Sequence, residues 1–277
     1  MRVNLGCGNS FFDQAGWINL DYESQSVSVV EADLANTIPL PDAVADFIYS
    51  SHLIEHLRPD QVRSFLLECF RILKPGGTLR IVTPDLENIA RQYLANIENK
   101  KYALAELELL LLIDQFVRVR PGGLYRQILN ELRASAKIEE IDYVYVRTGE
   151  HPIAGKDAFK SLKLAKTGRN QRRKFISRKF FKLRRLLNRL RFQVAAYMMP
   201  GIYRSSNVTF TSPGERHSWI YDYYTLSNLL LSLGFKNSEK LSYRTTNYYD
   251  NAVLQLDVDR NEMPRKGAQS MYIEVTR

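Results

Sequence analysis

The stretch N-L-G-C-G at residues 4–8, together with Asp21 thirteen residues after Gly8, decides the fold of this 277-residue chain. It reads as a short apolar strand, a tight glycine turn, and a second strand that ends in a carboxylate. Two glycines let the backbone approach a ligand where a Cβ would clash, and a carboxylate at a strand end can accept both hydroxyls of a ribose. The stretch therefore predicts a nucleoside site.

The sequence after the turn narrows the kind of nucleoside. A dinucleotide-binding G-x-G-x-x-G pattern needs a glycine at position 11, where the chain has Phe11. A nucleoside without a pyrophosphate fits better. The stretch resembles the first motif of class I S-adenosylmethionine-dependent methyltransferases, an acidic residue followed by any residue and G-x-G. Here Asn4 takes the acidic position, and Ser10 replaces a frequent third glycine.

Later motifs strengthen the resemblance. The run V-V-E-A-D-L at 29–34 places Asp33 after a third apolar segment, and A-D-F-I-Y-S-S-H at 45–52 reads as a buried strand that leads into a polar loop. R-I-L-K-P-G-G-T-L-R-I-V-T-P-D at 71–85 ends a helix at Pro-Gly-Gly before another strand. This last stretch resembles the type-11 methyltransferase group, and the likeness covers about residues 1–95.

The resemblance resumes near the C-terminus. H-S-W-I-Y-D at 217–222 precedes a helix predicted over 225–233, which Gly234 ends. Two strand-like runs follow, at 238–244 and 270–276. The pattern is similar to a subgroup of predicted bacterial methyltransferases that is often linked with cell-envelope sugar biosynthesis.

The resemblance implies an α/β, Rossmann-like class I methyltransferase fold. We expect a seven-stranded, mostly parallel sheet with an antiparallel edge strand, formed by residues 1–95 and 216–277. Residues 96–215 would be a helical, strongly basic insertion that serves as a lid or contacts a membrane or partner. Within it, a leucine-rich helix is predicted over 103–119.

The implied cofactor is S-adenosyl-L-methionine, held at the carboxyl ends of the strands. The glycine turn would line the methionine moiety, Asp21 would bind the ribose, and Asp33 and Leu34 would meet the adenine. Ser50 would border the methyl group. The predicted cofactor-binding residues are Asn4, Gly6, Cys7, Gly8, Asp21, Asp33, Leu34 and Ser50.

Methyl transfer to a hydroxyl requires a base near the acceptor. His52, Glu55 and His56 are spaced to share one face of a helix beside the predicted methyl position, and a neutral imidazole suits the base role at physiological pH. His56 is the favoured base because the pair Glu55-His56 matches the usual pattern of the family, and Glu55 would orient an imidazole. His52 and His217 are the other predicted catalytic residues. A purely structural role for these histidines stays open.

The same residues spell H-x-x-E-H, the signature of inverzincin zinc proteases. That function requires a long helix through the motif, whereas Pro59 interrupts a helix almost at once. The two cysteines, Cys7 and Cys69, predict neither a disulfide framework nor a metal cluster, and both are interpreted as packing residues. No metal site is therefore expected.

The missing motifs narrow the acceptor. The N/D-P-P-Y/F motif of amine-methylating enzymes is replaced by S-S-H-L at 50–53, and neither cysteine is placed as the nucleophile for carbon methylation. Oxygen methylation of a hydroxyl on an envelope glycan, glycolipid or related small molecule is favoured. The alternatives are an RNA methyltransferase and a non-catalytic nucleic-acid-binding protein on the same fold.

The charge of the chain is concentrated in one segment. Residues 156–193 contain fifteen Lys and Arg and one acid, a net +14, so the rest of the chain carries −5 of the total +9. Apolar residues recur there at helical spacing: Ile176, Phe180, Leu183, Leu187, Leu190 and Val194. Three interpretations remain: packing on the enzyme body, an anionic membrane surface bound through 170–199, and, less favoured, nucleic acid.

The expected location is the cytoplasm, with peripheral binding at the inner membrane face. The first strand is predicted to begin at the second residue, which leaves no room for a signal peptide, and no apolar run of about 18 residues predicts a spanning helix.

Overall fold

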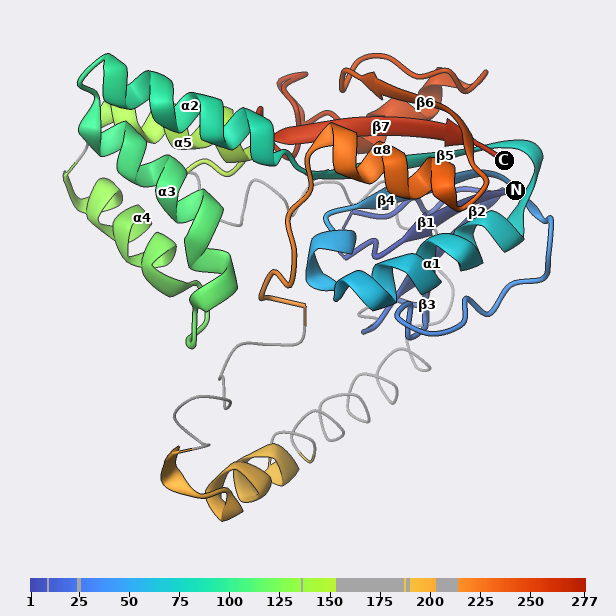
Figure 1. The fold of residues 1–277 in the computed structure, drawn as a ribbon, viewed down its shortest axis with the longest axis horizontal. Helices are drawn as coiled ribbons and strands as arrows, with labels where there is room; N and C mark the ends of the chain where they lie inside the picture. Colours follow the sequence, from blue (N-terminus) through green and yellow to red (C-terminus); the bar gives the residue numbers. More distant parts are fainter. Residues whose placement is uncertain (9, 24–25, 136, 153–186, 188–189, 203–213) are drawn as a thin grey trace, which may run out of the picture.

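The computed structural model describes residues 1–277 except 9, 24–25, 136, 153–186, 188–189 and 203–213. At its centre lies one seven-stranded sheet in the order β3-β2-β1-β4-β5-β7-β6 (Figure 1). The strands are β1 (Arg2–Leu5), β2 (Trp17–Asp21), β3 (Val29–Glu31), β4 (Ala45–Ser51), β5 (Leu73–Pro84), β6 (Lys236–Leu241) and β7 (Ser270–Thr276). The predicted Rossmann-like, seven-stranded fold is confirmed.

The pairing of the strands indicates at which end of the strands a ligand would bind. β1 to β5 pair in parallel. β7 runs antiparallel to both β5 and β6, so the antiparallel pairing that the sequence predicts lies at the end of the sheet where β6 is the last strand. β1 lies between β2 and β4, so the chain first builds the sheet outward in one direction and then in the other. In open parallel sheets, ligands bind at the carboxyl ends of the strands beside such a reversal.

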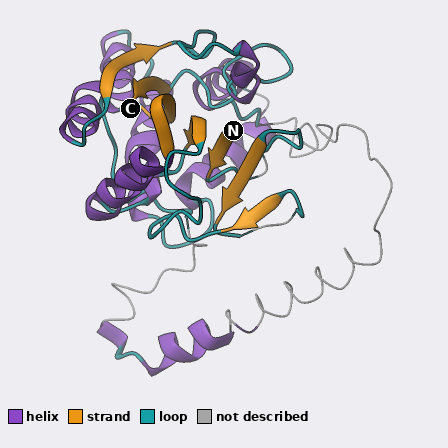
Figure 2. Ribbon diagram, turned by 90° about the vertical axis from the view of Figure 1, so that its right-hand side faces the viewer, coloured by secondary structure: helices purple, strands orange, loops and turns teal. Residues whose placement is uncertain are grey.

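Helices α1 (Pro59–Ile72) and α8 (Tyr223–Ser232) lie together on one side of the sheet (Figure 1). Proline suits the first turn of α1 because that amide has no intrahelical acceptor, and Asp222 caps α8 by accepting the Thr225 amide hydrogen. Both helices bury apolar side chains against the sheet, among them Phe65, Leu66 and Leu226. Figure 2 shows the strands of the twisted sheet in the turned view.

Four further helices form a unit of their own at one end of the sheet (Figure 1). They are α2 (Leu86–Glu98), α3 (Tyr102–Val117), α4 (Gly123–Ser135) and α5 (Ile138–Thr148). The leucine-rich helix predicted over 103–119 is confirmed as α3. α2 packs against α3, so the helical unit begins at Leu86, and the predicted boundary after residue 95 falls inside α2.

The helical unit is fastened to the chain segment that precedes β7. The amide of Ala268 donates to the Val146 carbonyl at 2.8 Å, and the amide of Gln269 donates to the Arg147 carbonyl at 3.1 Å. Gly267 has a φ of +71°, and a Cβ there would lie 2.1 Å from the Arg147 carbonyl oxygen, so only glycine permits this approach. The unit is thereby held next to the carboxyl ends of the central strands.

The predicted basic helical stripe lies mostly outside the described residues, which include only 187 and 190–202 of this region. Residues 190–198 are helical. Leu187, Leu190 and Val194 are exposed, with 46%, 48% and 60% of their surface accessible. No helix within the described part of the chain is long and apolar enough to cross a bilayer. The 3-10 helix η3 (Asn251–Leu256) packs through Val253 and Leu256 against side chains of β4, β5 and β7.

Candidate active site

The glycine turn has the geometry that the sequence predicts. Gly6 and Gly8 adopt positive φ angles of +68° and +51°. A Cβ on Gly6 would lie 3.1 Å from the Leu53 side chain, and a Cβ on Gly8 would meet nothing within 4 Å. The Gly8 amide donates to Asp21 Oδ2 at 2.7 Å. The turn and the carboxylate at the end of β2 therefore adjoin one another, as expected for a ribose-binding pair.

Asn4, in the acidic position of the motif, braces this turn from inside. Its side chain is buried, and its Nδ2 donates to the Ser10 carbonyl at 3.0 Å and to Asn19 Oδ1 at 3.3 Å. Asn19 in turn donates to the Phe12 carbonyl at 2.7 Å. An amide can donate to these carbonyls where a carboxylate could only accept, so this loop is held by neutral hydrogen bonds.

Two predicted adenine-binding residues differ in exposure. Asp33 is exposed, and its carboxylate accepts from the Ala35 amide at 3.1 Å and from Asn36 Nδ2 at 2.8 Å. Both bonds come from its own turn, and a carboxylate retains further lone pairs for a ligand. Leu34 is 4% exposed and belongs to the main hydrophobic core. Its side chain is therefore a core residue, and the role predicted for it beside an adenine stays a prediction.

Ser50 and Cys7 lie at the carboxyl ends of β4 and β1. The Ser50 hydroxyl is buried without a hydrogen-bond partner among the described residues. Cys7 is also buried, and burial, assisted by Asp21, raises the pKa of its thiol to about 12. Burial likewise raises the pKa of Cys69 well above its ordinary value. Burial and the raised pKa values disfavour the thiolate form of both residues, which agrees with the interpretation of both cysteines as packing residues.

The expected shared helix face of His52, Glu55 and His56 is wrong. Only Ile54–His56 are helical, as the single 3-10 turn η1, and His52 precedes it with a φ of +51°. α1 begins separately at Pro59, so no long helix runs through the H-x-x-E-H motif. The turn nevertheless brings His52 Nδ1 to 3.0 Å from Glu55 Oε1.

Glu55 is the buried centre of the site. Its side chain is 0% exposed, and Oε2 accepts from the Thr83 hydroxyl at 3.2 Å at the end of β5. Its backbone carbonyl accepts from the amides of Ser218 at 2.6 Å and Trp219 at 3.2 Å. Burial acts to raise the pKa of the carboxyl, but the neighbouring histidines outweigh it, and the pKa is about 2. Glu55 is therefore a buried carboxylate.

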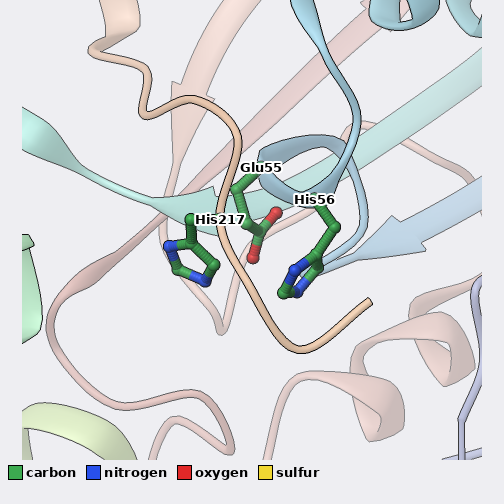
Figure 3. A group of neighbouring side chains, drawn as sticks. All are labelled: Glu55, His56 and His217. Atoms are coloured by element: carbon green, nitrogen blue, oxygen red, sulfur yellow. The ribbon is translucent and has the colours of Figure 1, made fainter. Parts of the chain in front are cut away.

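His56 and His217 flank this carboxylate, as Figure 3 shows. Their ring centroids lie 4.8 Å apart. His56 Nδ1 lies 2.9 Å from the Arg216 carbonyl, which can only accept, so Nδ1 is the donor in this contact. Burial lowers the pKa of His217 to about 3, and its Nδ1 has no hydrogen-bond partner among the described residues.

The three predicted catalytic histidines therefore meet in one place but are not equivalent. His52 has both ring nitrogens engaged, because Nε2 also contacts Ser270 Oγ at 3.0 Å. Burial lowers its pKa. His217 is almost fully buried. His56 is the member that is half-buried and has a ring nitrogen available to a ligand.

Three residues of this site escaped the sequence interpretation. Thr83, near the end of β5, contacts Glu55. Ser270, at the beginning of β7, contacts His52. Lys266 lies where burial lowers the pKa of its ammonium and the charge of Glu55 raises it. Each is far from the H-x-x-E-H motif in the chain, and no local pattern marks them. Pairing of β5 with β7 could have indicated that their neighbouring ends meet.

The helical unit covers this cluster. The His217 amide donates to the Gln115 carbonyl of α3 at 3.0 Å, and the ring of Phe116 lies 5.6 Å from the His217 ring, centroid to centroid. The Gly122 amide donates to Glu215 Oε1 at 2.6 Å. The end of α3 and the segment before α8 are thus joined above the carboxyl ends of β4 and β5.

Comparison with known proteins finds a family match in the core. Residues 4–81 match the family model described as a methyltransferase domain, of the type-11 group. This stretch contains the glycine turn, Asp21, Asp33 and the His52–His56 motif. The match is to the methyltransferase group that the sequence predicts.

Two curated relatives are similar over part of this region. A probable S-adenosylmethionine-dependent methyltransferase of Mycolicibacterium smegmatis is 41% identical over 78 residues, covering 24% of this chain and 29% of that protein. A probable S-adenosylmethionine-dependent methyltransferase of Mycobacterium tuberculosis is 38% identical over 74 residues, covering 27% of this chain and 26% of that protein. The chain thus matches less than a third of the length of either relative.

Among solved structures, the chain is similar to a SAM-dependent methyltransferase from Archaeoglobus fulgidus. That comparison covers 100% of this chain and 85% of the other, with 13% identity and a TM-score of 0.39.

Proposed function

We propose that the chain is an S-adenosylmethionine-dependent methyltransferase that methylates a hydroxyl oxygen. The observation that carries the proposal is the contact of Gly8 with Asp21, which joins the glycine turn to a carboxylate at the reversal point of the sheet. This arrangement offers an open backbone and two hydroxyl acceptors without a phosphate-binding helix start. It fits a nucleoside whose charge lies elsewhere.

The cofactor and the histidine cluster meet at one edge. β1 and β4 are paired in parallel with Leu5 opposite Ser50, so the glycine turn after β1 and the motif after β4 emerge side by side. Gly6 packs against Leu53, which lies between Ser50 and Glu55 in the sequence. A methionine moiety along the glycine turn would therefore point its methyl group toward the cluster.

The cluster has the chemistry to accept a hydroxyl substrate. Methyl transfer is an in-line displacement in which the acceptor oxygen forms the C–O bond as the sulfonium C–S bond breaks. The acceptor must lose its proton, and the histidine cluster removes it, with His56 as the base because its ring is half-buried and contacts Arg216 through Nδ1 alone. Glu55 holds the cluster together from its buried position.

An envelope glycan, a glycolipid or a related small molecule is the acceptor that we favour. The helical unit covers the cluster through the contacts of α3 with His217, and such a cover suits a small or terminal acceptor group. The likeness of the 217–222 segment to the envelope-sugar subgroup supports the same class. Extracted glycolipids incubated with the enzyme and methyl-labelled cofactor should gain label. Label that appears only in RNA would refute the acceptor class.

Residues 170–199 would place the enzyme at an anionic membrane surface on the cytoplasmic side. The support is the +14 charge of residues 156–193 and the exposure of Leu187, Leu190 and Val194 in the described part of the stripe. Each Lys or Arg near such a surface contributes about 1 kcal/mol, so five engaged residues would contribute roughly 5 kcal/mol.

Calorimetry with S-adenosylhomocysteine tests the cofactor assignment. We expect a micromolar dissociation constant for the wild type, about −8 kcal/mol. Asp21→Ala should weaken binding by about 1.5–3 kcal/mol, because two ribose hydroxyls lose a charged acceptor. Asp42→Asn is the matched control, since Asp42 is an exposed acid that precedes the amino end of β4, whereas Asp21 lies at the carboxyl end of β2. Absence of heat with the wild type would refute the proposed function.

A further inference from the structure

Three side chains of the site have the composition of a metal centre. Glu55, His56 and His217 each offer one ligand atom, and these atoms all lie within 4.8 Å of one another. In Figure 3 the two imidazoles stand on either side of the Glu55 carboxylate. Two imidazoles with one carboxylate are a ligand set used by zinc, whereas magnesium and calcium take mainly oxygen ligands.

Buried polar atoms of the cluster that lack a hydrogen-bond partner also favour a metal ion. His217 is 5% exposed, and its Nδ1 has no hydrogen-bond partner among the described residues. A buried polar atom without a partner is costly, and metal coordination would satisfy it. Glu55 is fully buried, and its carboxylate forms no ion pair with a Lys or Arg of the described residues. A divalent ion would compensate the carboxylate.

The surrounding hydrogen bonds prepare His56 and Glu55 as ligands. His56 donates its Nδ1 hydrogen to the Arg216 carbonyl, which orients the ring and leaves Nε2 for an ion. Thr83 donates to Glu55 Oε2, whereas Oε1 lies 3.0 Å from His52 Nδ1 and accepts no hydrogen bond from the described residues. Ligating histidines in proteins usually have a carbonyl or carboxylate behind them in this way.

The geometry requires only a small rearrangement. In a tetrahedral zinc site with bonds of about 2.0–2.1 Å, ligand atoms are roughly 3.3 Å apart. The widest pair in the cluster, at 4.8 Å or less, must therefore close by about 1.5 Å. Rotation of the half-buried His56 ring, which lies at the accessible side, can supply this movement.

We propose that Glu55, His56 and His217 bind a divalent transition-metal ion, with Zn²⁺ as the probe. The site differs from the inverzincin pattern, because His52 has both nitrogens engaged and His217 comes from the other side of the helical insertion. The ion would tie the segment after β4 to the segment before α8. Three protein ligands leave one position open.

What the open position does rests on the proposed function. An acceptor hydroxyl bound there would have a lowered pKa and would release its proton to solvent. The oxygen electron pair would then form the C–O bond while the C–S bond of the cofactor breaks. In this form of the enzyme, His56 acts as a ligand and the ion replaces it as the agent of proton removal.

Metal binding is tested without reference to methyl transfer. The full chain is stripped with a chelator and titrated with Zn²⁺ against a chromophoric competitor, and with Co²⁺ to record the absorption of a tetrahedral site. We expect one ion per chain. His56→Gln and His217→Gln should weaken binding by about 100-fold or more, since each removes a ligand. His56→Gln is the safer variant, because its side chain is only half-buried.

His151→Gln is the matched control, because His151 packs against Tyr145, with ring centroids 5.5 Å apart, and is not one of the three grouped ligand residues. Circular dichroism of each variant confirms the fold. Zn²⁺ affinity equal in wild type, His56→Gln and His217→Gln would overturn the site, as would absence of binding to the wild type. Turnover that needs His56 but ignores the chelator would overturn the role of the ion while sparing the methyltransferase function.

Discussion

Replacing Arg80 by methionine should destabilise the sheet more than any surface change. Arg80 lies in β5, is 0% exposed, and donates to Asp257 Oδ2 and Glu274 Oε1, both at 2.8 Å. Two more of its hydrogens go to the carbonyls of Ser242 and Thr245 at 3.0 Å. The one cation therefore holds β5, β7 and the loop after β6 together.

The magnitude follows from what the substitution leaves behind. Asp257 and Glu274 are 1% and 2% exposed, so both carboxylates would stay buried without their cation. Breaking a buried ion pair from one side typically costs about 3–5 kcal/mol. We expect the free energy of unfolding of Arg80→Met to fall by about that amount at pH 8, measured by urea denaturation.

The pH dependence has a definite sign. Burial raises the pKa of Asp257 to about 6, although Arg80 acts to lower it. Loss of Arg80 raises that pKa further, so the variant is stable when Asp257 is protonated and loses stability as the pH rises through the folded pKa. The defect of Arg80→Met should therefore be smaller at pH 5 than at pH 8. Adding Asp257→Asn and Glu274→Gln should restore stability. A defect that is equal at both pH values and survives the added substitutions would refute the electrostatic explanation.

Three further outcomes are expected. His56→Ala should lower turnover by about 10²-fold with cofactor affinity unchanged in calorimetry, whereas an equal loss of affinity would make His56 structural. Gly6→Ala should weaken cofactor binding, because its Cβ would press on Leu53 at 3.1 Å, whereas Gly76→Ala, equally left-handed but with open space, should not. Leu190→Asp should reduce co-sedimentation with anionic vesicles, which should also weaken at high salt; unchanged binding would contradict a role of the stripe.

The parts of the site that depend on local pattern were predictable. The turn and the strands on either side fix the positions of Gly6, Gly8 and Asp21, so the spacing of these residues in the sequence predicts their arrangement. Asn4 shows the limit of such a pattern. The motif expects an acid there, but the buried position next to the Ser10 carbonyl needs a donor, and only the structure shows this partner.

The histidine cluster depends on contacts that spacing cannot encode. The sequence placed His52, Glu55 and His56 on a helix, but Pro59 starts a new helix and leaves a single 3-10 turn. His217 was a candidate because of its motif alone. Its position beside Glu55 results from the backbone hydrogen bonds of Ser218 to Glu55, across more than 160 residues of chain.

This architecture makes the site depend on the helical insertion. The carbonyl of Glu55 holds the segment before α8, while α3 holds the same segment through the His217 amide and the Arg216 guanidinium. A loosened α3 would therefore release His217 from the cluster without disturbing the contact of Gly8 with Asp21, which joins the turn after β1 to the end of β2. Cofactor binding and the assembly of the acceptor site are for this reason separable, and an insertion that moves with acceptor binding would complete the histidine cluster only when the acceptor is present.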